Sequence, residues 1–288
     1  LLSRAIYNYN DKWLLTASIR RDGSSKFGEN NRWGNFPSFS IGYKISEEKF
    51  MENITWLSFM KIRAGWGVLG NQTIPPYQDE LGIYTGTNYI LADNTVVIGS
   101  MPNGVSNKDI HWEATNQTNI GLDMGMFRNK LTMSIDGFYK RTYDLLFQVP
   151  IPIMAGIHNL ERVGANAPWA YVNAAEMENK GMEAVLTYKN RIGDFNFNIS
   201  GNISFVRNEV VDLAGGKPLT SNDGYSKTEE GNSVAGFYGY MIDGIFRDYD
   251  DIANHATQLP EDPYVTNRTI EPSPTRYVAP GDFKFKDI

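Results

Sequence analysis

The stretch Phe195–Phe205 reads FNFNISGNISF and alternates apolar with polar residues along nearly its whole length. Successive side chains of an extended strand point to opposite faces, so this pattern predicts a β-strand with one apolar and one polar face. The same period of two returns in seven further segments, among them Trp13–Arg20, Met60–Val68 and Leu131–Tyr139. The sequence therefore predicts an all-β protein with eight strands.

The connections between these segments are alternately short and long. The short ones are Asn10–Lys12, Ile45–Trp56, Phe127–Lys130 and Asn190–Asp194. The long ones are Asp22–Asn35, Leu69–His111, Asp144–Lys180 and the chain from Arg207 onward. A soluble sandwich has no reason to sort its connections in this way, whereas a membrane barrel has short turns on one side and long loops on the other. Many of the segments also have the roughly 9–11 residues that span a bilayer when tilted.

Aromatic residues mark both ends of the apolar face. One group lies beside the short connections: Tyr9, Trp13, Tyr43, Tyr188 and Phe195. A second group lies beside the long ones: Trp66, Tyr139 and Phe205. Two aromatic girdles around an aliphatic band are typical of the two membrane interfaces of a barrel. The alternative is a soluble β-sheet with ordinary aromatic packing.

Composition sets further bounds on the function. The 288 residues carry a net charge of −6, which gives no indication of nucleic-acid binding. There are no cysteines, which excludes disulfides and thiolate metal sites. The mean hydropathy of −0.38 does not exclude a membrane, because barrel strands carry a weak hydropathy signal. We expect residues 1–288 to be an internal piece of one barrel domain, since neither end resembles a natural terminus.

Several strings in the chain resemble one family, the SusC/RagA-type TonB-linked outer-membrane proteins. In chain order the strings are LLTASIRRDGSSKFG (Leu14–Gly28), NFPSFSIG (Asn35–Gly42), KIRAGWGVLGNQ (Lys61–Gln72), WEATNQTNIGLD (Trp112–Asp123), NAAEMENKGME (Asn173–Glu183), FYGY (Phe237–Tyr240) and PGDFKFKD (Pro280–Asp287). The resemblance implies that the chain is an antiparallel transmembrane β-barrel segment, about 8–9 strands of a larger barrel of 22 strands with long extracellular loops.

The resemblance also implies a function and a set of partners. The expected function is TonB-dependent import of glycans or peptides through the outer membrane, with no bond made or broken. The expected partners are a SusD-like surface lipoprotein, the TonB complex acting through regions outside this sequence, outer-membrane lipid and an oligosaccharide or peptide substrate. The alternative is an autonomous structural or adhesive β-protein that binds ligands through its long loops.

Two sets of residues are candidates for contacts inside such an importer. Charged residues on the polar faces would line the lumen or meet a plug: Arg20, Lys61, Arg63, Asp123, Asp136 and Glu183. For Arg20 we favour a structural tie to a lumen acid, with Asp22-Gly23 setting a turn. Loop aromatics beside asparagine and aspartate would contact substrate by stacking and hydrogen bonding: Tyr77, Tyr84, Tyr89, Trp169 and Tyr171. The alternatives for these aromatics are loop self-packing and contact with the lid protein.

No catalytic constellation is found in the sequence. Glu176, Glu178 and Glu183 lack the spacing of a calcium loop, and we interpret the first two as solvated loop acids. The acidic run from Asp243 to Asp251 is interpreted as a charged loop. The three histidines, at 111, 158 and 255, show no zinc spacing. We therefore expect no enzyme activity, no metal and no cofactor.

Overall fold

A computed structural model describes residues 1–92, 94–102, 105–150, 169–214, 218–220, 224–255 and 278–286. The side chains of residues 84, 86, 87, 148–150, 169 and 170 lie outside this description. The chain divides into two compact units. The larger contains residues 1–219 and 228–234, and the smaller contains residues 220–227 and 235–288.

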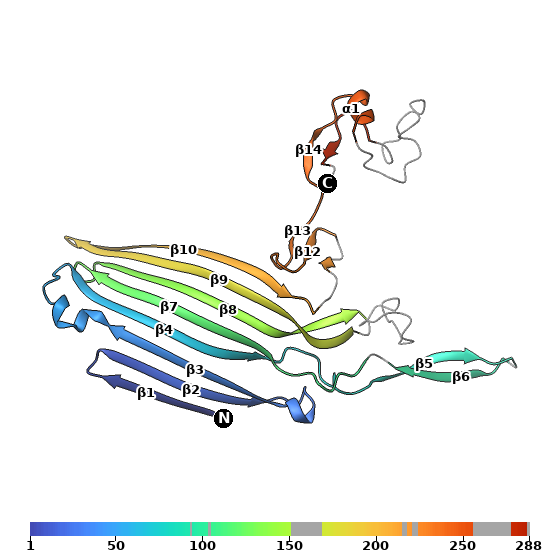
Figure 1. Ribbon diagram of the computed structural model, residues 1–288, viewed down its shortest axis with the longest axis horizontal. Helices are drawn as coiled ribbons and strands as arrows, with labels where there is room; N and C mark the ends of the chain where they lie inside the picture. Colours follow the sequence, from blue (N-terminus) through green and yellow to red (C-terminus); the bar gives the residue numbers. More distant parts are fainter. Residues whose placement is uncertain are drawn as a thin grey trace. The chain divides into compact units, whose positions relative to one another are not determined.

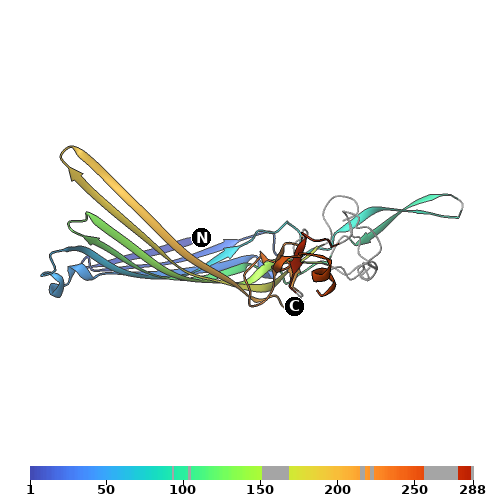
Figure 2. The same ribbon diagram turned by 90° about the horizontal axis from the view of Figure 1, so that it is seen from above.

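The larger unit is built on one antiparallel sheet of eight strands in the order β1-β2-β3-β4-β7-β8-β9-β10 (Figure 1). The strands are β1 (Leu2–Tyr9), β2 (Trp13–Gly23), β3 (Trp33–Lys44), β4 (Leu57–Asn71), β7 (Glu113–Met126), β8 (Leu131–Pro150), β9 (Trp169–Ile192) and β10 (Phe195–Asp212). All eight predicted strands are therefore confirmed, and β1 and β10 form the two edges. The sheet is twisted and curved, as Figure 2 shows, which matches an arc of barrel wall.

The short connections are tight because their residues adopt left-handed backbone angles. Asn10 and Asp11 have φ of 51° and 54°, and Lys12 N donates to Tyr9 O at 3.1 Å. Asparagine and aspartate tolerate these angles better than most residues, and such turns match the twist of the paired strands. Gly193, with φ of 61°, adopts the same left-handed backbone conformation in the turn between β9 and β10. The longer connection after β3 contains two 3-10 helices, η2 (Ile45–Glu47) and η3 (Lys49–Met51).

The long connections begin later and end earlier than the sequence predicts. Strand β2 continues through Asp22 and Gly23, which the sequence analysis assigned to a turn, and β3 begins already at Trp33. Strand β8 likewise continues to Pro150 and β9 begins at Trp169. The physical reason is that backbone pairing does not require apolar side chains. The polar residues that were interpreted as loop therefore extend the ladder beyond the apolar band.

The connection between β4 and β7 also contains structure that was not predicted. Strands β5 (Ile83–Ile90) and β6 (Val96–Pro102) form a separate two-stranded hairpin. Before it, the connection from β2 to β3 contains the 3-10 helix η1 (Glu29–Asn31).

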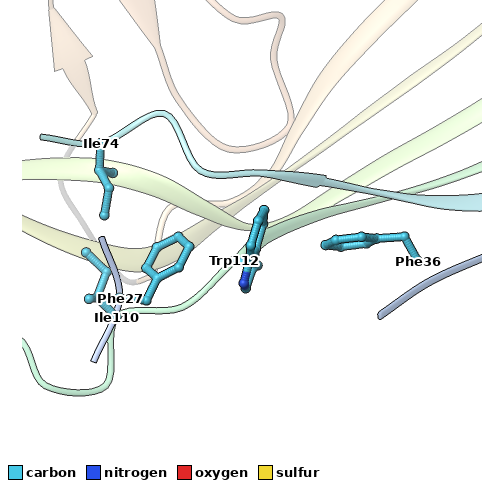
Figure 3. Close-up of a cluster of buried hydrophobic side chains, with 5 residues drawn as sticks. All are labelled: Phe27, Phe36, Ile74, Ile110 and Trp112. Atoms are coloured by element: carbon cyan, nitrogen blue, oxygen red, sulfur yellow. The ribbon is translucent and has the colours of Figure 1, made fainter. Parts of the chain in front are cut away.

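The principal buried core of the larger unit lies at the long-loop end of the sheet. It consists of five residues: Phe27, Phe36, Ile74, Ile110 and Trp112. Figure 3 shows Trp112 between Phe27 and Phe36, and its ring centroid is 5.3 Å from each of theirs. These side chains come from two long connections, β2 to β3 and β4 to β7, and from strand β3, so the cluster joins the bases of these two loops. We call it the loop-base cluster.

The smaller unit contains short elements only. They include β14 (Ile242–Ile245), which pairs with β15 (Phe283–Phe285), and the helix α1 (Tyr249–Ala253). Strand β12 (Ser226–Thr228) pairs with β13 (Gly236–Phe237), and β11 (Leu219–Thr220) precedes them. Among the described residues, no helix has the length and apolar character needed to cross a membrane.

Candidate functional site

Charged side chains from three neighbouring strands meet on the polar face of the sheet. Arg63 on β4 reaches across β7, and its Nη2 lies 2.6 Å from Oδ2 of Asp136 on β8. The same guanidinium donates from Nε to Asp123 Oδ2 at 3.0 Å and from Nη2 to Asp123 Oδ1 at 3.2 Å. Arg63 is therefore held by carboxylates from two strands at once.

Two further side chains complete this polar cluster. Lys61 Nζ lies 3.1 Å from Asp123 Oδ2, and the two residues are direct partners in the ladder. Ser134 Oγ donates to Asp123 Oδ1 at 2.8 Å. Asp123 thus accepts from two cations and one hydroxyl, an arrangement that satisfies a carboxylate shielded from bulk water. Together, Lys61, Arg63, Asp123, Ser134 and Asp136 form what we call the wall network.

A glycine on the intervening strand makes the wall network possible. Gly121 on β7 lies between Arg63 and Asp136 in the ladder and pairs with both. A Cβ at Gly121 would lie 2.6 Å from Arg63 Cζ and 2.7 Å from Asp136 Oδ1. Any other residue at this position would displace the guanidinium from the acid.

The wall network unites four of the six predicted lumen-facing candidates, and the other two lie elsewhere on the polar face. Glu183 on β9 pairs with Asp136 in the ladder, yet its carboxylate has no hydrogen bond or ion pair among the described residues. Arg20 Nε lies 2.7 Å from Asp22 Oδ2, and its guanidinium is 5.7 Å from the Phe36 ring. Arg20 therefore makes a local tie with Asp22 and contacts the loop-base cluster.

Asn173, to which the sequence analysis assigned no role, links the connection before β7 to strand β8. Asn173 Nδ2 on β9 donates to His111 O at 2.8 Å and to Asp144 O at 3.0 Å, while its Oδ1 accepts from His111 N at 3.0 Å. Asp144 lies in a register irregularity between β8 and β9 and has φ of 55°. The Asn173 amide therefore replaces backbone pairing where the ladder is interrupted.

The five predicted substrate-contact aromatics lie on three segments: the connection after β4, strand β5 and strand β9. Tyr77 is 69% exposed in the connection after β4, and Tyr89 is 65% exposed on β5. Tyr171 on β9 packs against the loop-base cluster, and its carbonyl accepts from Asn107 Nδ2 at 3.0 Å. Tyr84 and Trp169 belong to β5 and β9, but their side chains lie outside the described part of the chain.

Several of the acidic residues that the sequence singled out are engaged with cations or with backbone. Glu176 pairs with Arg141, and Glu178 Oε1 accepts from Lys180 Nζ at 2.8 Å. Both glutamates lie within β9, so their interpretation as loop acids is wrong. The Asp248 side chain accepts from Asp251 N at 2.8 Å and caps α1. Within the described ranges, no group of three or more acidic, histidine or cysteine residues could hold a metal ion.

The chain is similar to known proteins over most of its length. The family model described as "TonB dependent receptor-like, beta-barrel" matches residues 3–268. The chain belongs to the TonB-dependent receptors. Within this family it is 38% identical over 256 residues to a TonB-dependent receptor of Formosa agariphila, covering 87% of this chain and 22% of that protein. It is 37% identical over 218 residues to TonB-dependent receptor SusC of Bacteroides thetaiotaomicron, covering 74% of this chain and 21% of that protein.

Solved structures of a related importer have the same fold. The RagAB peptide transporter superposes with a TM-score of 0.73 and 28% identity, covering 85% of this chain and 26% of that one. The RagAB peptide importer in its closed-closed state superposes with a TM-score of 0.72 and 27% identity, covering 85% of this chain and 26% of that one. These likenesses confirm the predicted SusC/RagA-type family, its partial antiparallel barrel and its location in the outer membrane. The chain spans about a fifth of the length of the relatives named above.

Proposed function

We propose that this chain forms part of the wall of an outer-membrane importer, driven by TonB, that takes up oligosaccharides or peptides. The observation that carries the proposal is the two-sided sheet, with the wall network on one face and exposed apolar side chains on the other. Charges that face lipid near the bilayer midplane cost about 2–4 kcal/mol each, so the network face belongs to the interior. The family membership and the likeness to SusC and RagAB support the same role.

Within that role, the wall network stabilises the sheet, and Glu183 contacts the plug or the cargo. The Arg63 guanidinium is paired with two carboxylates through Nε and Nη2, so it links three strands and its charge is already neutralised. Glu183 is exposed on the same face with no partner in the described part of the chain. We propose that Glu183 meets a cation of the plug or of the cargo. Residues 1–288 as a whole are proposed to belong to one barrel domain.

The exposed tyrosines and the partners complete the proposal. Tyr77 and Tyr89 present amphipathic rings at the long-loop end, which suits stacking on sugars or peptide side chains. With them we group Tyr84, Trp169 and Tyr171 as candidate cargo contacts. A SusD-like lipoprotein would cover this end, and import would involve no bond cleavage and hence no enzymatic residue or cofactor. RagAB, by its name a peptide importer, supports a peptide cargo, and glycans remain the other cargo class that the family resemblance implies.

A growth experiment tests the import function. The gene for the full-length protein is deleted and then restored, and each strain is grown on single oligosaccharides or peptide mixtures as the limiting nutrient. The proposal expects one nutrient class to support growth only when the gene and a functional TonB complex are both present. Equal growth of all strains on every nutrient, with binding of ligand to whole cells retained, would favour the adhesive alternative.

A labelling experiment tests the orientation separately. Tyr77 lies in a long connection and Lys49 in a short one, and both are exposed. We expect an impermeant thiol reagent to label Tyr77→Cys on intact cells and to label Lys49→Cys only after the outer membrane is opened. Labelling in the reverse order would contradict the proposed orientation.

A further inference from the structure

A groove of about 860 Å³ runs over the apolar face of the sheet between β7 and β10. Its floor is one row of ladder partners, each on the next strand: Ile120, Gly137, Met182 and Phe205. Ile120 is 62%, Met182 58% and Phe205 65% exposed, so no described residue of the larger unit covers the floor. In the barrel proposed above, on which this inference rests, this side of the sheet faces the membrane.

Gly137 creates the depth of this groove. A Cβ added at Gly137 would find only the Ile120 carbonyl oxygen, at 4.0 Å. Its neighbours Ile120 and Met182 carry full side chains on either side. The missing side chain therefore leaves a notch between two apolar walls, with room for a hydrocarbon chain.

The rim of the groove is polar and partly cationic. The row of ladder partners nearer the long connections is Thr118, Tyr139, Lys180 and Arg207. Lys180 and Arg207 lie directly opposite each other, and both line the groove.

The two cations of the rim differ in how fully they are engaged. Lys180 Nζ is bound to Glu178 Oε1 at 2.8 Å and lies 3.9 Å from Glu209 Oε2. Glu178 is occupied in turn, because its Oε2 accepts from Tyr139 Oη at 2.9 Å. The Arg207 guanidinium is exposed and makes no ion pair within the described ranges. Arg207 is therefore the cation that is available to an anion.

We propose that this groove binds one anionic lipid from the membrane leaflet on the long-loop side. An acyl chain lies in the notch at Gly137, and the phosphate of the headgroup contacts Arg207 beside Lys180. The order of the two rows supports this occupant, because apolar floor and cationic rim follow each other along the strands as acyl chain and headgroup do along a lipid. Arginine at such a position keeps its stem on apolar surface and its charge at the interface.

Lipid retention by the full-length protein tests the proposal. The purified protein is incubated in detergent with phosphatidylglycerol or with phosphatidylcholine of the same acyl chains, and retained lipid is counted by native mass spectrometry. We expect phosphatidylglycerol to be preferred, and Arg207→Gln to lower its apparent affinity about five-fold, the effect of one cation near an anionic lipid surface. Gly137→Leu should abolish retention of both lipids by filling the notch. Inorganic phosphate alone should not compete.

Two matched variants serve as controls. Gly201 lies on the apolar face of β10 outside the groove, and a Cβ there would meet nothing within 4 Å, so Gly201→Leu should retain lipid normally. Arg191→Gln removes an exposed cation at the short-turn end of β9 and should do the same. If Gly137→Leu fails to fold, Arg207→Gln decides alone. Unchanged retention in Arg207→Gln, or a copurifying protein that is lost in Gly137→Leu while lipid stays bound, would overturn the proposal.

Discussion

Arg63 and Asp136 form an ion pair of 2.6 Å although a whole strand, β7, separates the strands that carry them. The contact depends on the absence of a side chain at Gly121, over which the guanidinium passes. A charged pair on adjacent strands would fix one register, whereas this pair fixes the relative positions of three strands. The ion pair therefore helps to set how β4, β7 and β8 lie next to one another in the curved sheet.

The first prediction concerns the passage over Gly121. We expect Gly121→Ala to destabilise the full-length protein by about 1–3 kcal/mol, because the new methyl group displaces Arg63, leaves Asp136 without a cation and leaves Asp123 with Lys61 alone. Thermal unfolding in detergent measures the change. Gly201→Ala is the matched control, since its Cβ would have open space on a strand of the same sheet. Equal losses in both variants would show that the passage of Arg63 contributes nothing.

A double-mutant cycle should show that the wall network acts as one unit. Arg63→Gln and Asp136→Asn each remove one side of the same pair, so their effects on unfolding free energy should be non-additive by about 0.5–3 kcal/mol. Asp123→Asn should cost more than Asp136→Asn, because Asp123 neutralises Lys61 as well as Arg63. The cycle is measured on the full-length protein at low and moderate salt. Strict additivity would contradict the network.

The sequence predicted this network only in part, and the limit has a physical cause. The period of two put Arg63, Asp123 and Asp136 on polar faces, and the short turn between β7 and β8 makes Asp123 and Asp136 neighbours. Arg63 lies on β4, which is joined to β7 by a long connection, so the sequence did not show that these two strands pair. The contact of Arg63 with Asp136 over Gly121 can be predicted only when the register of all three strands β4, β7 and β8 is known. The groove at Gly137 was missed for the same reason, because one glycine becomes a notch only when the side chains of both adjacent strands are in place.

The long-loop end was harder to predict, since its strands are not amphipathic. Above the apolar band, both faces of a strand contact water or other loops. Apolar and polar residues therefore no longer alternate there, and the sequence pattern does not show which residues form a strand. The β5–β6 hairpin was missed for this reason. Asn173 was missed because the role of its amide depends on an interrupted register.

A further prediction concerns the loop-base cluster, where Phe27 has no exposed surface. We expect Phe27→Ala to cost about 3–5 kcal/mol, because it leaves a cavity between Ile110 and Trp112 that the surrounding loops fill only in part. Limited proteolysis of the full-length protein should then cleave the connections after β2 and β4 sooner than in wild type. Tyr77→Ala, on an exposed ring in the second of these connections, is the control and should leave the cleavage rate nearly unchanged. Equal protection of all three proteins would show that the cluster does not anchor these loops.

The last prediction uses the short-turn end, where Glu48 ties two connections together. Glu48 Oε1 accepts from Tyr43 Oη at 2.8 Å, and Glu48 Oε2 lies 3.1 Å from Lys12 Nζ. The Tyr43 hydroxyl, and after it the Lys12 ammonium, lower the pKa of Glu48 below its ordinary value of 4.5. A carboxyl whose pKa is lowered by folding stabilises the folded state above its unfolded pKa, and this contribution is lost as the pH falls through the folded value.

The expected outcome is a difference that depends on pH. Wild type should melt at a higher temperature than Glu48→Gln at pH 7, and the gap should narrow once the pH falls below about 4.5. Glu52→Gln, which changes an exposed acid of the same connection, should show no such gap at any pH, because the Glu52 carboxylate makes no ion pair in the part of the chain that the structure describes. A gap for Glu48→Gln that stayed constant down to pH 3 would mean that the tie acts through packing and not through the charge of the carboxylate.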